Sequence, residues 1–165
     1  MLNSAVGPYN FALGNSVRVS VGKLVLLALL AAAPLPAFAK DAALVVAKNS
    51  KVTAVQSAAF IKAFKSAPAR LADGQEIILV VKLLKTPETQ AVASKLLAQT
   101  PEGLSQMATN RSIIVVNSDA EVIRLVSSTP NAVGVVDTYS ITSEIVVVKV
   151  DGKLPLEPGY LLHYH

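Results

Sequence analysis

The sequence predicts a single α/β domain, a sandwich in which helices cover both faces of a mixed, mostly parallel sheet. Two observations carry this prediction. Several short runs rich in valine and isoleucine are almost continuously apolar, as strands are when both faces of their sheet are covered. Segments with helix start signals lie between these runs, and that alternation is typical of α/β folds.

The first half of the domain alternates strands and helices. Residues 43–47 (ALVVA) and 77–82 (IILVVK) are predicted strands. Between them, Thr53 opens a capping box with a glutamine three residues later, which predicts a helix start. The second strand is followed by Thr86, then proline and glutamate. That order places a cap, a first-turn proline and an acid at the start of a second helix.

The second half continues the pattern. Thr100 is again followed by proline and glutamate and predicts a short third helix. The run 112–117 (SIIVVN) is a predicted strand, and Ser118 opens a capping box with a glutamate three residues later. The runs 132–136 (AVGVV) and 144–150 (EIVVVKV) complete the predicted sheet.

The beginning of the chain predicts export. Two basic residues precede an unbroken apolar run at 24–33 (LVLLALLAAA), and Ala-Phe-Ala at 37–39 gives the small-x-small pattern that signal peptidases cleave. Such a run forms a helix about 15 Å long, half the roughly 30 Å core of a bilayer. We therefore expect residues 1–39 to be a cleavable signal peptide and residues 40–165 to be a periplasmic or secreted domain without a membrane span. A retained membrane anchor is the alternative.

The composition of the chain excludes some partners and some means of stabilisation. The 15 basic and 11 acidic residues give a formal net charge of +4, and the basic residues are scattered, so nucleic acid is not an expected partner. The chain has no cysteine. An exported domain of this size must then be stabilised by a packed core rather than by disulfides.

Side chains that commonly carry catalysis are scarce. There is no cysteine nucleophile and no glycine-rich phosphate loop, and the two histidines, His163 and His165, lie at the C-terminal end. Two histidines without a third fixed ligand would bind a metal only weakly. We expect a protein that is not an enzyme and that has no cofactor and no metal site.

Several segments share their pattern with one family. Asn49 lies in the loop after the first strand, and residues 72–78 (ADGQEII) join an Asp-Gly turn to a strand. Residues 118–136 combine an acidic cap, a valine-rich helix, Thr-Pro and a glycine-containing strand. These segments resemble the small extracytoplasmic domains related to phosphate-transport-type periplasmic substrate-binding proteins, and the resemblance touches nearly all of residues 42–162.

The resemblance implies a type 2 periplasmic-binding fold and a non-catalytic solute-binding role. It implies phosphate or another small oxyanion as the ligand, and a transporter or another envelope protein as the partner. Other segments depart from the family pattern: the chain has no tryptophan, and residues 84–89 (LKTPET) contain no glycine where relatives have a Ser- and Gly-rich anion loop. These departures favour a second hypothesis, in which the domain has no small ligand and acts as an interaction module in the envelope.

The helix that follows Thr86 is the candidate anion site. Backbone N–H groups near Thr89 are free in its first turn, the helix dipole favours an anion, and Lys85 adds a charge. The Thr86 hydroxyl would be a further donor. The alternative is that Thr86 only caps the helix and Lys85 is solvated, with the Glu88 carboxylate already at the positive end of the helix.

The other candidate ligand-binding residues follow strands. Asn49 and Ser50 come after the first strand, at the kind of carboxyl end where open α/β sheets bind ligands. The family resemblance implies that Thr138, after the strand at 132–136, faces the same cleft. The solute-binding hypothesis thus predicts one polar pocket lined by Ser50, Thr86 and Thr138. The alternative for each residue is an ordinary turn or cap.

Overall fold

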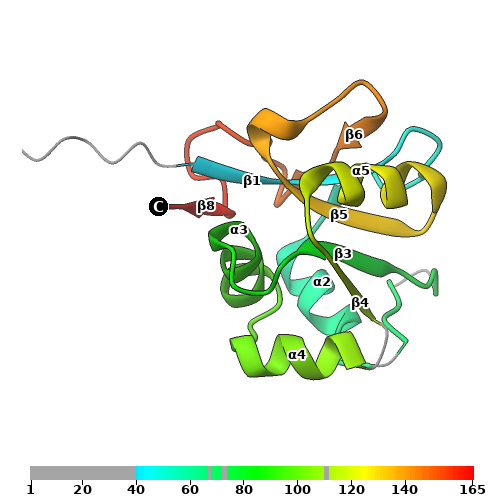
Figure 1. The fold of residues 1–165 in the computed structure, drawn as a ribbon, viewed down its shortest axis with the longest axis vertical. Coiled ribbons are helices and arrows are strands. Elements are labelled where there is room, and N and C mark those ends of the chain that lie inside the picture. The colour runs from blue at the N-terminus through cyan, green and yellow to red at the C-terminus, as the bar shows by residue number, and fades with distance from the viewer. Residues whose placement is uncertain (1–39, 67, 72–73, 110–111) are drawn as a thin grey trace, which may run out of the picture. The chain divides into compact units, whose positions relative to one another are not determined.

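A computed structural model describes residues 40–66, 68–71, 74–109 and 112–165 (Figure 1). The predicted signal peptide at 1–39 lies outside the described residues. The described residues belong to one compact unit. Within the described ranges, no helix is long and apolar enough to cross a membrane.

A mixed sheet forms the centre of this unit. Its strands are β1 (Lys40–Ala47), β3 (Ile78–Lys82), β4 (Ile113–Val116), β5 (Ala132–Asp137), β6 (Ile145–Val147) and β8 (His163–Tyr164). Their order is β4-β3-β5-β1-β6, and β8 pairs with the start of β1. β3 runs parallel to β4 and β5, whereas β1 runs antiparallel to β5 and β6. The prediction of a mixed sheet is confirmed, with β1 as the strand that opposes its neighbours.

Helices occupy the connections, largely where the start signals predict them. They are α2 (Ser57–Ala63), α3 (Pro87–Ala91), the π-helical turn η1 (Val92–Leu96), α4 (Pro101–Thr109), α5 (Asp119–Ser128) and the 3₁₀ turn η2 (Thr138–Ser140). Pro87 is the first residue of α3, as predicted. Ser118 caps α5 by accepting the Glu121 N–H at 3.3 Å, so the predicted helix start is confirmed. The Glu121 carboxylate accepts the N–H of Asn117 rather than that of Ser118.

The helix start predicted from the first capping box is wrong. Ala54–Val55 form a short strand, β2, which pairs in parallel with β7 (Lys149–Val150), and α2 begins only at Ser57. The Ser57 N–H donates to the Asp151 carboxylate at 2.8 Å. A residue far along the chain thus satisfies the start of α2 in place of a local cap. The same pairing divides the predicted strand at 144–150 into β6 and β7.

Two clusters of buried side chains cover the two faces of the sheet. α5 packs on one face, whereas α2, η1 and α4 contribute to the cluster on the other (Figure 1). Successive residues of β1 alternate between the clusters: Leu44 belongs to the larger one and Val45 to the smaller one. Both faces are covered, as the continuous apolar strands predict.

Candidate functional site

The carboxyl ends of β3, β4 and β5 meet at one edge of the sheet, and the antiparallel β1 begins at the same edge. Lys82 ends β3, Asp119 follows β4, and Asp137 ends β5. Asp41 of β1 lies near them, because its neighbour in the chain is the register partner of Asp137. With two residues from α3 and β8, this group is termed the carboxyl edge: Asp41, Lys82, Glu88, Asp119, Asp137 and His163.

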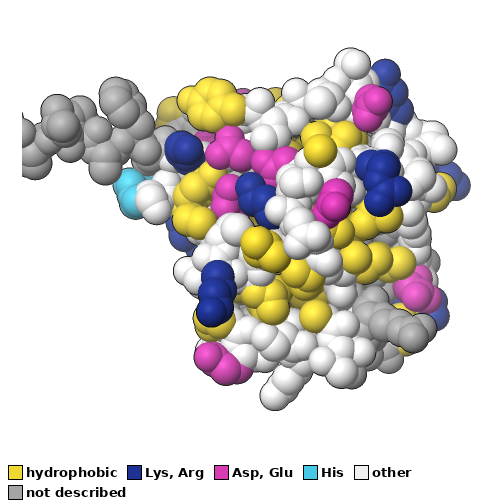
Figure 2. Space-filling view, viewed as in Figure 1, with side chains coloured by type: hydrophobic (Ala, Val, Ile, Leu, Met, Phe, Trp, Pro, Cys, Tyr) yellow, Lys and Arg dark blue, Asp and Glu magenta, His cyan; other side chains and the backbone are white. Residues whose placement is uncertain are grey.

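The Lys82 ammonium is held between two carboxylates. Its Nζ lies 2.9 Å from Glu88 Oε1 and 2.9 Å from Asp119 Oδ1. Figure 2 shows acidic side chains gathered around a basic one on this face. The Ser140 hydroxyl donates to Asp119 Oδ2 at 2.6 Å. Burial alone would lower the pKa of Lys82, but the hydrogen bonds and charges of the two carboxylates outweigh it and raise that pKa.

Glu88 gives this cluster an excess of negative charge. The residue is 8% exposed, and only its Oε1 meets Lys82. Its Oε2 is buried without a hydrogen-bond partner among the described residues. Because one ammonium faces two carboxylates, the formal charge of the cluster is negative, and a further anion would be repelled from it.

The start of α3 has no free hydroxyl donor for an anion. Thr86 Oγ1 donates to Thr89 Oγ1 at 3.0 Å, and Thr89 Oγ1 donates to the Lys82 carbonyl at 2.7 Å. Thr89 is buried, whereas Lys85 is exposed. The helix itself has only five residues. The structure therefore brings Thr86 and Thr89 together, but their hydroxyl protons are used within the protein.

Tyr164 joins β8 to the carboxyl edge. Its hydroxyl donates to Asp137 Oδ2 at 2.8 Å, and Asp137 Oδ1 accepts the Tyr139 N–H at 2.9 Å. Burial, the hydrogen bond to Asp137 and the negative charges of Glu88 and Asp119 all raise the pKa of Tyr164. Three carboxylates thus act on one phenol at this end of the sheet.

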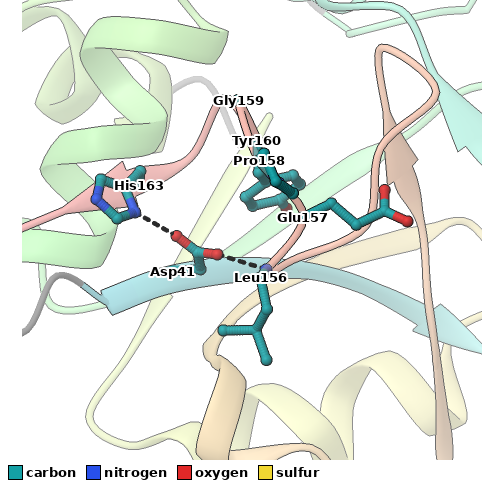
Figure 3. A pocket seen from close by; sticks show the side chains of 7 residues that line it. All are labelled: Asp41, Leu156, Glu157, Pro158, Gly159, Tyr160 and His163. Atoms are coloured by element: carbon teal, nitrogen blue, oxygen red, sulfur yellow. Dashed lines mark hydrogen bonds and ion pairs between the residues drawn. The ribbon is translucent and has the colours of Figure 1, made fainter.

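A pocket of about 360 Å³ opens beside Asp41 (Figure 3). His163, Tyr160 and the loop 156–159 complete its lining. Asp41 is 6% exposed; its Oδ1 lies 2.7 Å from His163 Nδ1, and its Oδ2 accepts the Leu156 N–H at 2.5 Å. The one buried carboxylate of the pocket is therefore already bonded through both oxygens.

The structure separates the predicted ligand-binding residues into two groups. β1 runs against β5, so the loop with Asn49 and Ser50 lies at the edge opposite the carboxyl edge. Ser50 Oγ accepts the Val52 N–H at 3.2 Å there, as a turn residue does. Thr138 lies at the carboxyl edge, but its hydroxyl donates to the Asp41 carbonyl at 2.6 Å. The predicted pocket, which would combine Ser50 with Thr138, is therefore not formed.

The predicted ligand-binding residues include none of the charged residues of the carboxyl edge. Lys82, Asp119 and Asp137 each stand at or just after the end of a predicted strand, which is a usable signal. The pair of Asp41 and His163 has no such signal, because its members are 122 positions apart. In the described ranges no group of three or more His, Asp or Glu side chains is placed to hold a metal ion.

Comparison with known proteins finds solved structures of similar fold and no match by sequence. No protein-family model matches the chain, and no curated protein does. An ABC-type phosphate transport receptor from Vibrio cholerae superposes with a TM-score of 0.54 at 16% identity, covering 76% of this chain and 54% of that one. PstS from Borrelia burgdorferi gives a TM-score of 0.55 at 14% identity, covering 77% of this chain and 55% of that one.

The chain thus spans about half the length of these proteins. Identities of this size establish a shared fold and leave the ligand open. The mixed sheet with helices on both faces is the feature that carries the likeness. The described part of the chain shares its fold with about half of each of these solved proteins, and the fold is the one that the sequence resemblance implies.

Proposed function

We propose that this chain is a non-catalytic, extracytoplasmic interaction module built on a solute-binding fold. The observation that carries the proposal is the pairing of Lys82 with Glu88 and Asp119, at the sheet edge where open α/β folds bind ligands. A phosphate ion at Lys82 would have to displace two carboxylates and remain beside them. Like charges 4 Å apart repel by about 4 kcal/mol at an effective dielectric constant of 20, so an anion is disfavoured there.

Other features support the same proposal. The signal-like sequence at 1–39 supports an extracytoplasmic location. The likeness to a transport receptor supports the absence of catalysis.

A receptor for phosphate or another small oxyanion, working with a transporter, is the second candidate. It is favoured by the fold shared with a phosphate transport receptor. It is also favoured by Lys85, an exposed cation directly before Thr86 at the start of α3. An anion bound at this place would lie near the negative charge of Glu88 in the first turn of α3.

Isothermal calorimetry distinguishes the two functions. Residues 40–165, which contain every helix and strand of the compact unit, are titrated with phosphate and then with sulfate in a phosphate-free buffer. The interaction module predicts no binding tighter than about 1 mM with either anion. A receptor predicts binding at about 1 µM, near −8 kcal/mol. That binding would be lost in the Lys85→Ala, Thr86→Ala double variant and kept in Lys149→Ala, and it would overturn the proposal.

The Glu88→Gln variant tests the physical reason. It removes one of the two negative charges at Lys82 while keeping the size of the side chain. If electrostatic repulsion excludes anions, sulfate binds this variant more tightly than it binds the wild type. If sulfate binding is undetectable for both the wild type and Glu88→Gln, the charge of Glu88 is not what excludes the anion.

A further inference from the structure

The outer edge of β4 is apolar and unpaired. β4 is the last strand of the described sheet, so only one of its sides is paired, with β3. Its four residues are all isoleucine or valine, and Ile114 and Val115 are 38% and 36% exposed. Neighbouring residues of a strand point to opposite faces, so both faces of the sheet are partly uncovered here. Figure 2 shows hydrophobic side chains clustered over β4.

The pairing with β3 determines which backbone groups of β4 are free. Leu79 is the register partner of Ile113, and its N–H donates to the Ser112 carbonyl at 3.1 Å. In a parallel pair of strands, a hydrogen-bonded residue bonds to the two residues on either side of its register partner, not to the partner itself. The even-numbered positions of β4 therefore bond to β3. The N–H and C=O groups of Ile113 and Val115 face outward, away from the sheet.

The free edge ends at Asn117. The N–H of Asn117, which is the next outward-facing group, donates to the Glu121 carboxylate of α5 at 2.7 Å. A partner strand cannot use that donor. Among the described residues, the unpaired edge thus comprises the backbone of Ile113 and Val115, with the exposed apolar side chains of Ile114 and Val115 beside it.

We propose that β4 pairs with β4 of a second copy of this chain, antiparallel and about a two-fold axis. Another strand is the partner that satisfies the free donors and acceptors of a strand edge together. A second copy fits because the two-fold axis places each N–H of one edge opposite a C=O of the other, which makes the edge electrostatically self-complementary. The segment 112–117 contains no charged residue, so two copies bring no like charges together.

The free groups also select the register of the pair. Outward-facing residues must lie opposite outward-facing residues in an antiparallel ladder. One register that meets this condition places Val115 opposite its own copy and Ile113 opposite Asn117, whose N–H is already taken. Another places Ile114 opposite its own copy and Ile113 opposite Val115. The second register uses every free group and covers both exposed side chains.

The size of the interface predicts how firmly the copies associate. A strand of four residues on each side makes a contact at the low end of protein interfaces. We therefore expect a reversible dimer whose share rises with protein concentration, rather than a permanent one.

Disulfide trapping tests both the pairing and its register. The chain has no cysteine, so a single introduced cysteine can cross-link only to its own copy. In the selected register, Ile114 faces Ile114 across a non-hydrogen-bonded pair, where Cα atoms lie about 4.5 Å apart and a disulfide can form. We expect Ile114→Cys to give covalent dimers under mild oxidation. Val115→Cys, on the same strand, should stay largely reduced, because it faces Ile113.

Val146→Cys is the matched control for random collisions. It lies on β6, the last strand at the opposite side of the sheet, and is 42% exposed. Cross-linking of Ile114→Cys no faster than that of Val146→Cys would overturn the proposed pair. Cross-linking of Val115→Cys in preference to Ile114→Cys would overturn the register.

Sedimentation velocity over a concentration series tests association without cross-linking. We expect the sedimentation coefficient of residues 40–165 to rise with concentration, Ile114→Lys to abolish the rise, and Val146→Lys to leave it unchanged. A thermal melt of each variant confirms that it is folded. A wild-type protein that stays monomeric throughout would overturn the proposal, even if it bound a strand of another protein. Phosphate titration does not involve the β4 edge. The proposed function can therefore fail or hold independently of the proposed dimer.

Discussion

Lys82 is the residue on which the carboxyl edge depends. Its side chain is 20% exposed, and the side chains of its partners Glu88 and Asp119 are 11% and 15% exposed. Charged side chains buried to this extent are tolerated only when they are paired. The three residues therefore act as one unit. Removal of the lysine leaves two carboxylates without their counter-ion.

Lys82→Met is expected to lower the free energy of unfolding by about 3 kcal/mol, because it leaves largely buried carboxylates uncompensated. Urea denaturation at neutral pH measures the change. Lys149→Met replaces an exposed lysine and should change the free energy of unfolding by less than about 0.5 kcal/mol. If the free energy of unfolding falls as little in Lys82→Met as in this control, Glu88 and Asp119 are solvated well enough to need no partner.

Among the elements, α5 depends on a glycine in the strand beneath it. A Cβ atom at Gly134 of β5 would lie 2.6 Å from Val126 Cγ2 and 2.7 Å from Val122 Cγ1. Both valines are fully buried, so neither methyl group can turn toward solvent. The glycine allows the helix and the sheet to approach more closely than a side chain at this position would permit.

Gly134→Ala is expected to destabilise the protein by about 2 kcal/mol through overpacking. Gly103→Ala, in α4, is the control: its Cβ would meet the flexible side chain of Gln99, and alanine favours a helix by up to about 1 kcal/mol. Thermal unfolding followed by circular dichroism compares the two variants. Equal melting temperatures would show that α5 can move away from β5 without cost.

Elements whose signals are local could be predicted from the sequence, and elements set by distant contacts could not. Ser118 caps α5 as predicted, since both partners lie within one turn. The start of α2 at Ser57 rests on Asp151, 94 positions away, and no local pattern contains that contact. The direction of β1 is likewise set by its pairing with β5, and it decides which edge of the sheet receives Asn49 and Ser50.

In the compact unit as a whole, the last strand closes onto the first. Lys40 and Asp41 pair with Tyr164 and His163, and the Asp41 carboxylate also holds the Leu156 N–H. The α/β architecture could be predicted, because burial on both faces of a sheet leaves continuous apolar runs. This closure could not be predicted, because the C-terminal segment carries no strand signal. The candidate site could therefore not be predicted either, since it depends on which residues this segment brings to the carboxyl edge.

Three groups tie the stability of this unit to pH. Burial raises the pKa of Tyr160 and of Tyr164, and the carboxylate partners of Lys82 raise its pKa despite burial. In the unfolded chain these groups lose their protons near pH 10, at about their ordinary pKa values. In the folded chain they keep them to higher pH. The stability they contribute is therefore complete below about pH 10 and is lost as the pH rises through the folded pKa values.

The melting temperature should therefore change little between about pH 7 and 9 and fall steeply above about pH 10. Tyr164→Phe removes one titrating group and keeps the ring, so its fall above pH 10 should be shallower. Its melting temperature at neutral pH should be lower, because Asp137 loses a hydrogen bond. Tyr139→Phe, at a position 82% exposed, is the control and should follow the wild type. Equal slopes for wild type and Tyr164→Phe would show that Tyr164 ionises as readily in the folded protein as in the unfolded chain.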